Sequence, residues 1–103
     1  MYFKEYIDLG IVTEIEVGFQ TEETVTYGKV FADKLSVFRK EYYEAMKIGL
    51  KPEVAFAIRL HDYVGQTRLL LNDKDYFLVR SGENQKNDTM ELFFSSEVGE
   101  VIE

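Results

Sequence analysis

The stretch Glu-Val-Ala-Phe-Ala-Ile-Arg-Leu-His, at positions 53–61, alternates between large apolar residues and smaller or polar ones. One side of the extended chain carries the apolar residues Val54, Phe56, Ile58 and Leu60. Alternation with a period of two is typical of a β-strand with one buried face. This segment therefore predicts a strand over residues 53–60, and it sets the class of the fold.

The same pattern recurs on both sides of this strand. Upstream, one face of residues 11–17 carries Ile11, Thr13, Ile15 and Val17, which predicts a half-buried strand. Further strands are predicted at 25–35, 67–71, 76–80 and 89–95. Polar composition predicts loops at 18–24 and 81–88 and a turn at 72–75, where Asn and Asp tolerate a left-handed backbone.

One segment changes period. A stripe at helical spacing, formed by Phe38, Tyr42, Ala45 and Met46, predicts a helix over residues 36–48. Five to six strands without βαβ alternation predict a mainly β (α+β) chain. The expected architecture is a single domain over 1–103, a small antiparallel β-barrel or sandwich with the short helix inserted between strands 2 and 3. The strands from residue 53 to residue 95 are expected to form a continuous meander.

The composition of the chain excludes several kinds of site and disfavours several classes of partner. The 103 residues include no cysteine and one histidine, which excludes disulfides, thiolate metal sites and multi-histidine metal sites. The 12 basic and 19 acidic residues give a net charge of −7, which disfavours duplex DNA and acidic membrane surfaces as partners. No apolar run reaches the length of a membrane span, and no secretion signal is recognised, so a cytoplasmic setting or a particle assembled there is expected.

Catalytic and metal-binding patterns are weak. His61 and Asp62 are adjacent, and adjacent residues on a strand point to opposite faces, so a surface pair is expected there in place of a catalytic dyad. The acidic residues Glu14, Glu16, Glu22 and Glu23 lack the spacing of a calcium loop and are expected to be solvated. No catalytic, cofactor-binding or metal-binding residues are predicted, and no enzymatic activity or cofactor is expected.

Residues 38–53 read Phe-Arg-Lys-Glu-Tyr-Tyr-Glu-Ala-Met-Lys-Ile-Gly-Leu-Lys-Pro-Glu. This stretch resembles the central signature of the head–tail joining proteins of tailed phages, also called head-closure or stopper proteins. In that family an E-[FY]-[FY]-x-A helix precedes a Gly/Lys/Pro turn and a strand ending in [IV]-R, here Ile58-Arg59. Similar matches occur, in the family's order, at residues 29–34, 62–65, 76–80 and 90–92, so the resemblance covers about residues 8 to 95.

The resemblance implies a structural, non-enzymatic virion component. Such a subunit joins a homo-oligomeric ring of twelve copies below the portal and adaptor proteins, closes the DNA exit channel and offers a platform for the tail. By analogy the segment 37–53 approaches the channel, and its expected contact residues are Glu41, Tyr42, Tyr43, Lys47 and Lys51. Loops 18–24 and 81–88 are candidate contacts to neighbouring rings. An acidic ring would let DNA slide without sticking, and its subunits would repel one another before assembly.

Two other interpretations stay open from the sequence. The chain could be a tail-completion or adaptor ring subunit, because small barrels recur along the connector. It could also be a small barrel that binds a peptide or single-stranded nucleic acid, since its seven tyrosines and eight phenylalanines could stack bases. Core packing explains most of these aromatics first, and the acidic balance removes the electrostatic attraction that a nucleic-acid module needs.

Overall fold

The computed structural model describes residues 4–36 and 52–96. It is mainly β, as the alternation predicts, with six strands and one short 3-10 helix in these residues. The elements are β1 (Glu5–Val17), β2 (Gln20–Leu35), β3 (Val54–Arg59), η1 (Leu60–Asp62), β4 (Arg68–Leu71), β5 (Lys74–Asn84) and β6 (Thr89–Ser95). The helix predicted over 36–48 lies almost wholly outside the described residues. No helix in the described ranges is long and apolar enough to span a membrane.

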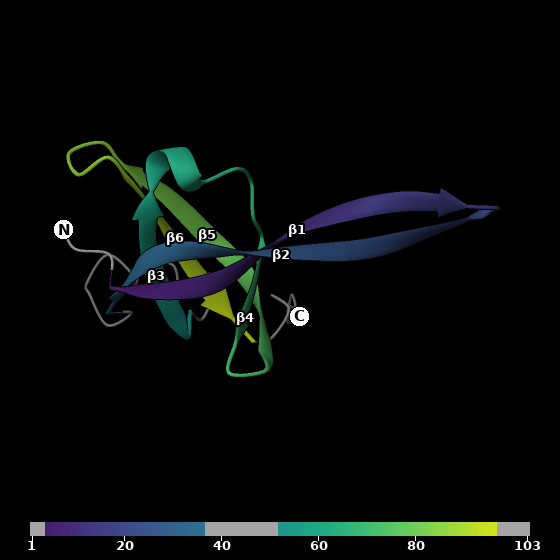
Figure 1. Cartoon of the computed structure of the whole chain (residues 1–103), viewed down its shortest axis with the longest axis horizontal. Helices are drawn as coiled ribbons and strands as arrows, with labels where there is room; N and C mark the ends of the chain where they lie inside the picture. The colour runs from purple at the N-terminus through teal and green to yellow at the C-terminus, as the bar shows by residue number, and fades with distance from the viewer. Residues whose placement is uncertain (1–3, 37–51, 97–103) are drawn as a thin grey trace, which may run out of the picture.

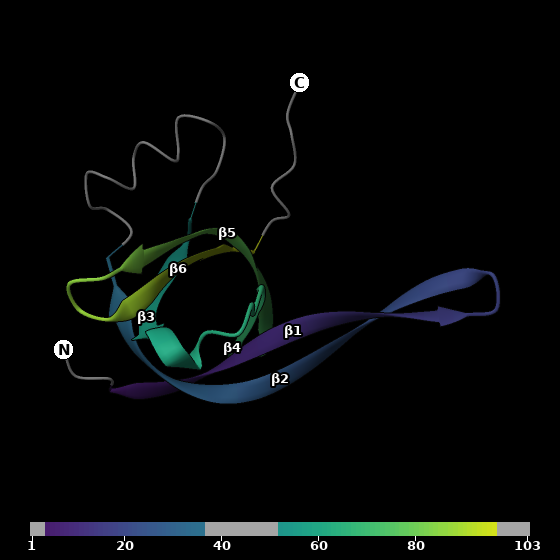
Figure 2. The ribbon, with the colours of Figure 1, turned by 90° about the horizontal axis from the view of Figure 1, so that it is seen from above.

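The strands form a closed antiparallel barrel in the order β1-β2-β3-β6-β5-β4 (Figures 1 and 2). The prediction of a continuous meander from residue 53 is wrong in its first step, because β3 pairs with β2 and β6 and not with β4. After β3 the chain turns through η1 and reaches β1, where Thr67 N–H donates to the Gly10 carbonyl at 3.0 Å. β4 then pairs with β1 and closes the barrel.

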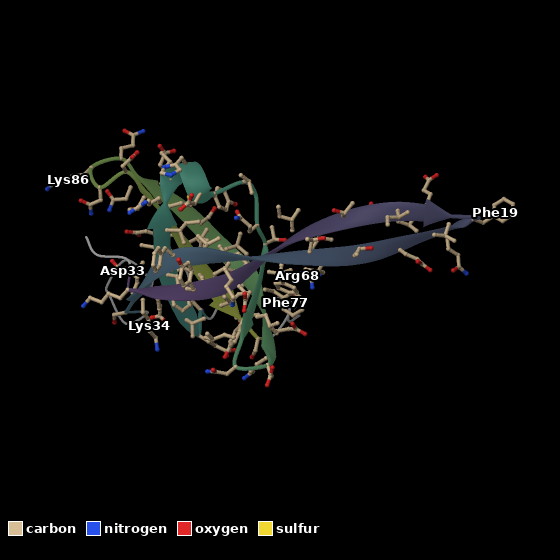
Figure 3. All side chains as sticks on the ribbon, viewed as in Figure 1. Phe19, Asp33, Lys34, Arg68, Phe77 and Lys86 are labelled. Carbon is tan, nitrogen blue, oxygen red and sulfur yellow. The ribbon has the colours of Figure 1, made fainter. Side chains whose placement is uncertain are left out.

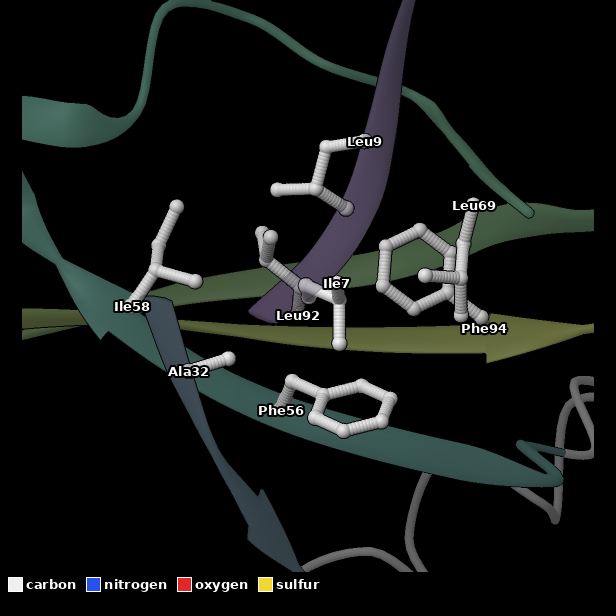
Figure 4. Close-up of a cluster of buried hydrophobic side chains, with 8 residues drawn as sticks. All are labelled: Ile7, Leu9, Ala32, Phe56, Ile58, Leu69, Leu92 and Phe94. Carbon is white, nitrogen blue, oxygen red and sulfur yellow. The ribbon is translucent and has the colours of Figure 1, made fainter. Parts of the chain in front are cut away.

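The interior of the barrel is filled by the apolar positions that the alternation singles out (Figure 4). Phe56 and Ile58 of β3 lie there with residues from four of the other strands. The cluster of fully buried side chains comprises Ile7, Leu9, Ala32, Phe56, Ile58, Leu69, Leu92 and Phe94. Burial of this apolar surface is the main stabilising contribution to such a fold.

The outward face of β3 is buried as well. Ala55 and Phe93 form a second small buried cluster, with Leu35 and Val79 packed against it. The Arg80 guanidinium lies over the Phe93 ring at 5.5 Å from its centroid. The small residues of β3 therefore leave room for packing on its outer side, so this strand is buried on both faces.

Several boundaries differ from the predicted ones. β1 begins at Glu5, β2 begins at Gln20, and β5 continues to Asn84, so most of the loop predicted over 18–24 and half of the loop predicted over 81–88 are strand. Gly28 pairs in register with Leu9, so no bulge interrupts β2 at this glycine. A register shift occurs instead between Leu78 and Arg80. The predicted turn after β4 is confirmed, with positive φ at its first two residues.

Glu53 ties the start of β3 to the end of β6. Its backbone N–H donates to the Phe94 carbonyl at 2.7 Å, and its carboxylate accepts from the hydroxyls of Ser95 and Ser96 and from the Ser96 N–H. The Ser96 hydroxyl bond is the largest influence on this carboxyl and lowers its pKa below the ordinary value, against the smaller effect of burial. The ionised form is therefore favoured in the folded protein.

We expect this carboxylate to contribute to the loss of stability in acid. A pKa that is lower in the folded state adds stability above the unfolded value of about 4.3, and that contribution disappears as the pH falls through the folded value. Glu53→Gln should therefore narrow the difference in unfolding free energy between pH 7 and pH 3, by less than about 1 kcal/mol because the carboxylate is largely exposed. Urea titrations across this range would test it, and parallel pH profiles for the two proteins would contradict it.

Candidate functional site

A long hairpin projects from the barrel (Figures 1 and 2). β1 pairs with β4 only at residues 8–10, and β2 pairs with β3 only at residues 32–35. Between these points residues 11–17 pair in unbroken register with residues 20–26. We call residues 11–27 the hairpin arm; within the described part of the chain its two strands pair only with each other.

The arm continues the inward face of the barrel into solvent. Ile7 and Leu9 of β1 are buried in the core, and the odd-numbered positions beyond them carry Ile11, Ile15 and Val17 on the same face. Ile15 is 49% exposed and Val17 is 51% exposed. The strand predicted over 11–17 is confirmed as the outer part of β1, but its predicted half-burial is wrong: the amphipathic pattern is present and its apolar face is uncovered.

The tip of the arm is a two-residue turn. Gly18 has a φ of +65°, a value that favours glycine, and Val17 pairs with Gln20 across the turn. Glycine at the first central position is typical of the type II′ turns that match the twist of a hairpin. The second position places Phe19 at the far end of the molecule, fully exposed (Figure 3).

The arm is also acidic. Residues 11–27 contain four glutamates and no lysine, arginine or histidine. Glu14 lies directly opposite Glu23, and like charges in this position destabilise a strand pair. Glu23 is partly compensated by Arg68 of β4, whose Nη2 lies 3.6 Å from its carboxylate. The arm thus combines an apolar stripe with an excess of negative charge.

The root of the arm is fixed against β4 and β5. Gly10 leaves room for two side chains of β2, because a Cβ at this position would lie 2.7 Å from Val25 and 2.8 Å from Tyr27. The Tyr27 hydroxyl donates to the Asp75 carboxylate at 3.3 Å. Burial, with a smaller effect of the Asp75 charge, raises the pKa of Tyr27. These contacts hold the direction of the arm.

Arg68 is the other anchor at the root. Besides pairing with the arm, its guanidinium lies 4.5 Å from the centroid of the Phe77 ring on β5. A cation over an aromatic face is attracted by the ring's quadrupole. Figure 3 shows the two side chains beneath the point where the hairpin leaves the barrel.

A second exposed apolar feature lies at the other end of the same two strands. The rings of Tyr6 and Phe31 stack at 4.0 Å between centroids with an interplanar angle of 11°. Tyr6 is 59% exposed and Phe31 is 38% exposed. They occupy paired positions of β1 and β2 on the outward face, since their neighbours Ile7 and Ala32 are in the core. We call these two residues the aromatic pair.

The contact residues expected from the sequence lie between the two described ranges, 4–36 and 52–96. Glu41, Tyr42, Tyr43, Lys47 and Lys51 all lie outside the described residues, so their role stays a prediction. The region 18–24, expected to contact neighbouring rings, comprises the tip of the arm and the outer part of β2. The expected contact region 81–88 comprises the end of β5 and the turn into β6.

His61 and Asp62 belong to η1 and not to a strand; the His61 side chain is exposed and the Asp62 side chain is half-buried. The expectation that these two side chains point to opposite faces is therefore wrong. They approach each other to 3.5 Å, because side chains in a 3-10 turn do not alternate as they do in a strand. In the ranges 4–36 and 52–96, no group of three or more histidine, cysteine or acidic residues could hold a metal ion.

Sequence reasoning missed the aromatic pair, and it identified only residues 18–24 of the arm as a contact region, in the form of a loop. The signal for the arm was the pair Gly18-Phe19 between two segments of matching length, but the glutamates and threonines that follow suggested a loop. The aromatic pair depends on the register between β1 and β2, which no local pattern of residues 4–6 reveals. The chain matches no protein-family model, no curated protein and no solved structure.

Proposed function

We propose that this chain is a structural component of a tailed phage or prophage, a ring-forming subunit of the head–tail connector. Twelve copies would close the DNA exit channel after packaging and provide the platform to which the tail attaches. Its partners would be further copies of itself, the portal and adaptor proteins on the head side and the end of the tail. It would act without catalysis, in the virion and, during assembly, in the host cytoplasm.

The observation that carries this proposal is the hairpin arm. A barrel of this size can bury its core alone, yet this chain extends an apolar strand face well beyond it. The exposed apolar residues Ile11, Ile15 and Val17 lie along one strand and pair with Thr26, Glu22 and Gln20 on the same face. Exposed apolar surface rimmed by polar residues is typical of interaction sites. An element of this kind is expected in a subunit that becomes buried in an assembly. The motifs that resemble those of head–tail joining proteins support a head–tail connector as that assembly.

The charge supports the same proposal. A net charge of −7 per subunit gives a twelve-membered ring a strongly negative field. Phosphates would be repelled from such a lumen, so packaged DNA could pass without sticking when the channel opens. The same charge disfavours a nucleic-acid-binding module, because such proteins replace counterions with basic residues.

Reconstitution on phage heads would test the proposal. Purified protein is added to DNA-filled, tailless heads that lack it, and two quantities are followed: co-sedimentation of the protein and nuclease sensitivity of the packaged DNA. We expect saturable binding at a small fixed number of copies per head, with the DNA retained.

Complete virions are the matched control, because their connectors are already occupied and should not take up added protein. Absence of binding to heads, with continued leakage of DNA, would contradict the stopper role. Binding to isolated tails in that case would identify a tail-completion subunit.

A further inference from the structure

The arm exposes two features that can bind another chain: apolar side chains and unpaired backbone edges. Its apolar stripe of Ile11, Ile15 and Val17 is exposed, with Phe19 beyond it at the tip. Its backbone edges are also open, since among the described residues no strand pairs with the outer side of residues 11–17 or of residues 20–31. An isolated two-stranded ribbon is marginal in water, and open edges readily pair with another chain.

The aromatic pair is the complementary feature, and it lies on the same two strands at the opposite end. Arm and aromatic pair are separated by the length of the hairpin, and the arm points away from the barrel (Figure 1). One copy therefore cannot cover its own aromatic pair with its own arm. Two different surfaces on opposite ends of a molecule define a head-to-tail contact, which closes into a ring when the rotation between copies permits.

The charges favour a contact between the arm of one copy and the aromatic pair of another over a contact between two arms. Two arms side by side would bring eight glutamates together without a basic residue, since each arm contributes four. The strands around the aromatic pair carry both signs. Lys29 forms an ion pair with Asp8 at 3.2 Å, and Lys4 and Asp33 lie close together, since the backbone N–H of Lys4 donates to the Asp33 carboxylate at 3.1 Å. An acidic arm meets less repulsion there than on another arm.

The length of the arm also fits a second copy. The seven residues of β1 beyond Gly10 span about 23 Å at roughly 3.3 Å per residue. The shortest principal extent of the whole molecule is 26 Å. The arm is thus long enough to lie across most of a neighbouring barrel.

We propose that the hairpin arm of one copy docks on the aromatic pair of the next copy, with the apolar stripe seated against Tyr6 and Phe31. The contact would join the copies of the chain head to tail. This inference rests on the proposed function only for closure into a ring; the contact itself follows from the two exposed features.

Cross-linking between different copies would test the contact. The chain contains no cysteine, so a single introduced thiol reports on one position. Thr13→Cys places a thiol on the apolar stripe, and Lys4→Cys places one beside the aromatic pair; neither removes an apolar contact residue. The two full-length variants are mixed at high protein concentration, at low and at molar salt, and treated with a short bismaleimide.

We expect a cross-linked dimer in the mixture at several-fold higher yield than in either variant alone. Equal yield in Thr13→Cys alone would show that arms meet arms and would overturn the proposal. Absence of a cross-link in the mixture under both salt conditions would also overturn it.

A matched pair of second substitutions separates the apolar stripe from general surface effects. Ile15→Thr, added to Thr13→Cys, should lower the yield with Lys4→Cys several-fold. Val64→Thr, which alters an exposed apolar residue beyond η1, should leave the yield unchanged. Equal losses from the two would count against the stripe.

Failure of this contact and failure of the proposed function are distinguishable. A cross-link without binding to heads would retain the contact and remove the connector role. Binding to heads without a cross-link would retain the connector role and remove the contact.

Discussion

Phe56→Ala is expected to lower the free energy of unfolding by about 3–5 kcal/mol, as for other large-to-small changes of a fully buried phenylalanine. Phe56 lies in the barrel interior with Ile7, Ala32 and Leu92 around it (Figure 4). The loss combines the transfer free energy of the ring with the cavity that remains, because a closed barrel cannot collapse into the space. A domain has a total free energy of unfolding of roughly 5–15 kcal/mol, so this substitution would remove a large part of the stability.

Urea denaturation followed by circular dichroism would measure this loss. Phe19→Ala is the matched control, since it removes the same ring from the fully exposed tip of the arm. Its effect should stay within about 0.5 kcal/mol. Comparable losses in the two variants would mean that the arm, and not only the barrel, takes part in the cooperative core.

Gly10→Ala is expected to destabilise the fold by about 1–3 kcal/mol, the usual cost of overpacking. The added methyl group would meet Val25 and Tyr27 at less than 3 Å, and Tyr27 cannot retreat freely while its hydroxyl binds Asp75. Release of that hydrogen bond would loosen the root of the arm. The substitution should therefore speed amide exchange in residues 11–27 relative to the unaltered protein, with a smaller change in the barrel.

Gly28→Ala is the matched control for this substitution. Gly28 pairs with Leu9 one position before Gly10, and a methyl group there meets nothing within 4 Å. Its backbone does not require glycine, so alanine should leave the stability unchanged or raise it by up to about 1 kcal/mol. Equal destabilisation by the two alanines would contradict the role assigned to Val25 and Tyr27.

The fold class followed from the sequence because the strands and turns of the barrel are encoded locally. The alternation in residues 53–60 reports directly on which side chains face the interior, and the turn at Asn72 and Asp73 is specified by residues that accept a positive φ. The pairing of β3 with β6 was not accessible in this way. This pairing joins strands that are far apart in the chain. The periodicity of a single segment carries no information about such long-range pairing.

The arm shows a different limit. Periodicity in residues 11–17 correctly indicated an apolar face, but a pattern of side chains does not say whether anything covers that face. The glutamates and threonines of residues 21–24 suggested a loop because strands of a globular core seldom carry them. In a ribbon exposed on both sides, the same residues are compatible with a strand.

The unbroken register of the arm also limits how its length can change during evolution or design. Because side chains alternate, adding one residue to each strand would turn the Gly18-Phe19 tip to the opposite face of the ribbon. Adding two residues to each strand would move the tip outward by about 7 Å and restore its original facing. Reach and orientation are therefore coupled, and arms that bind the same partner surface are expected to differ in length by multiples of four residues.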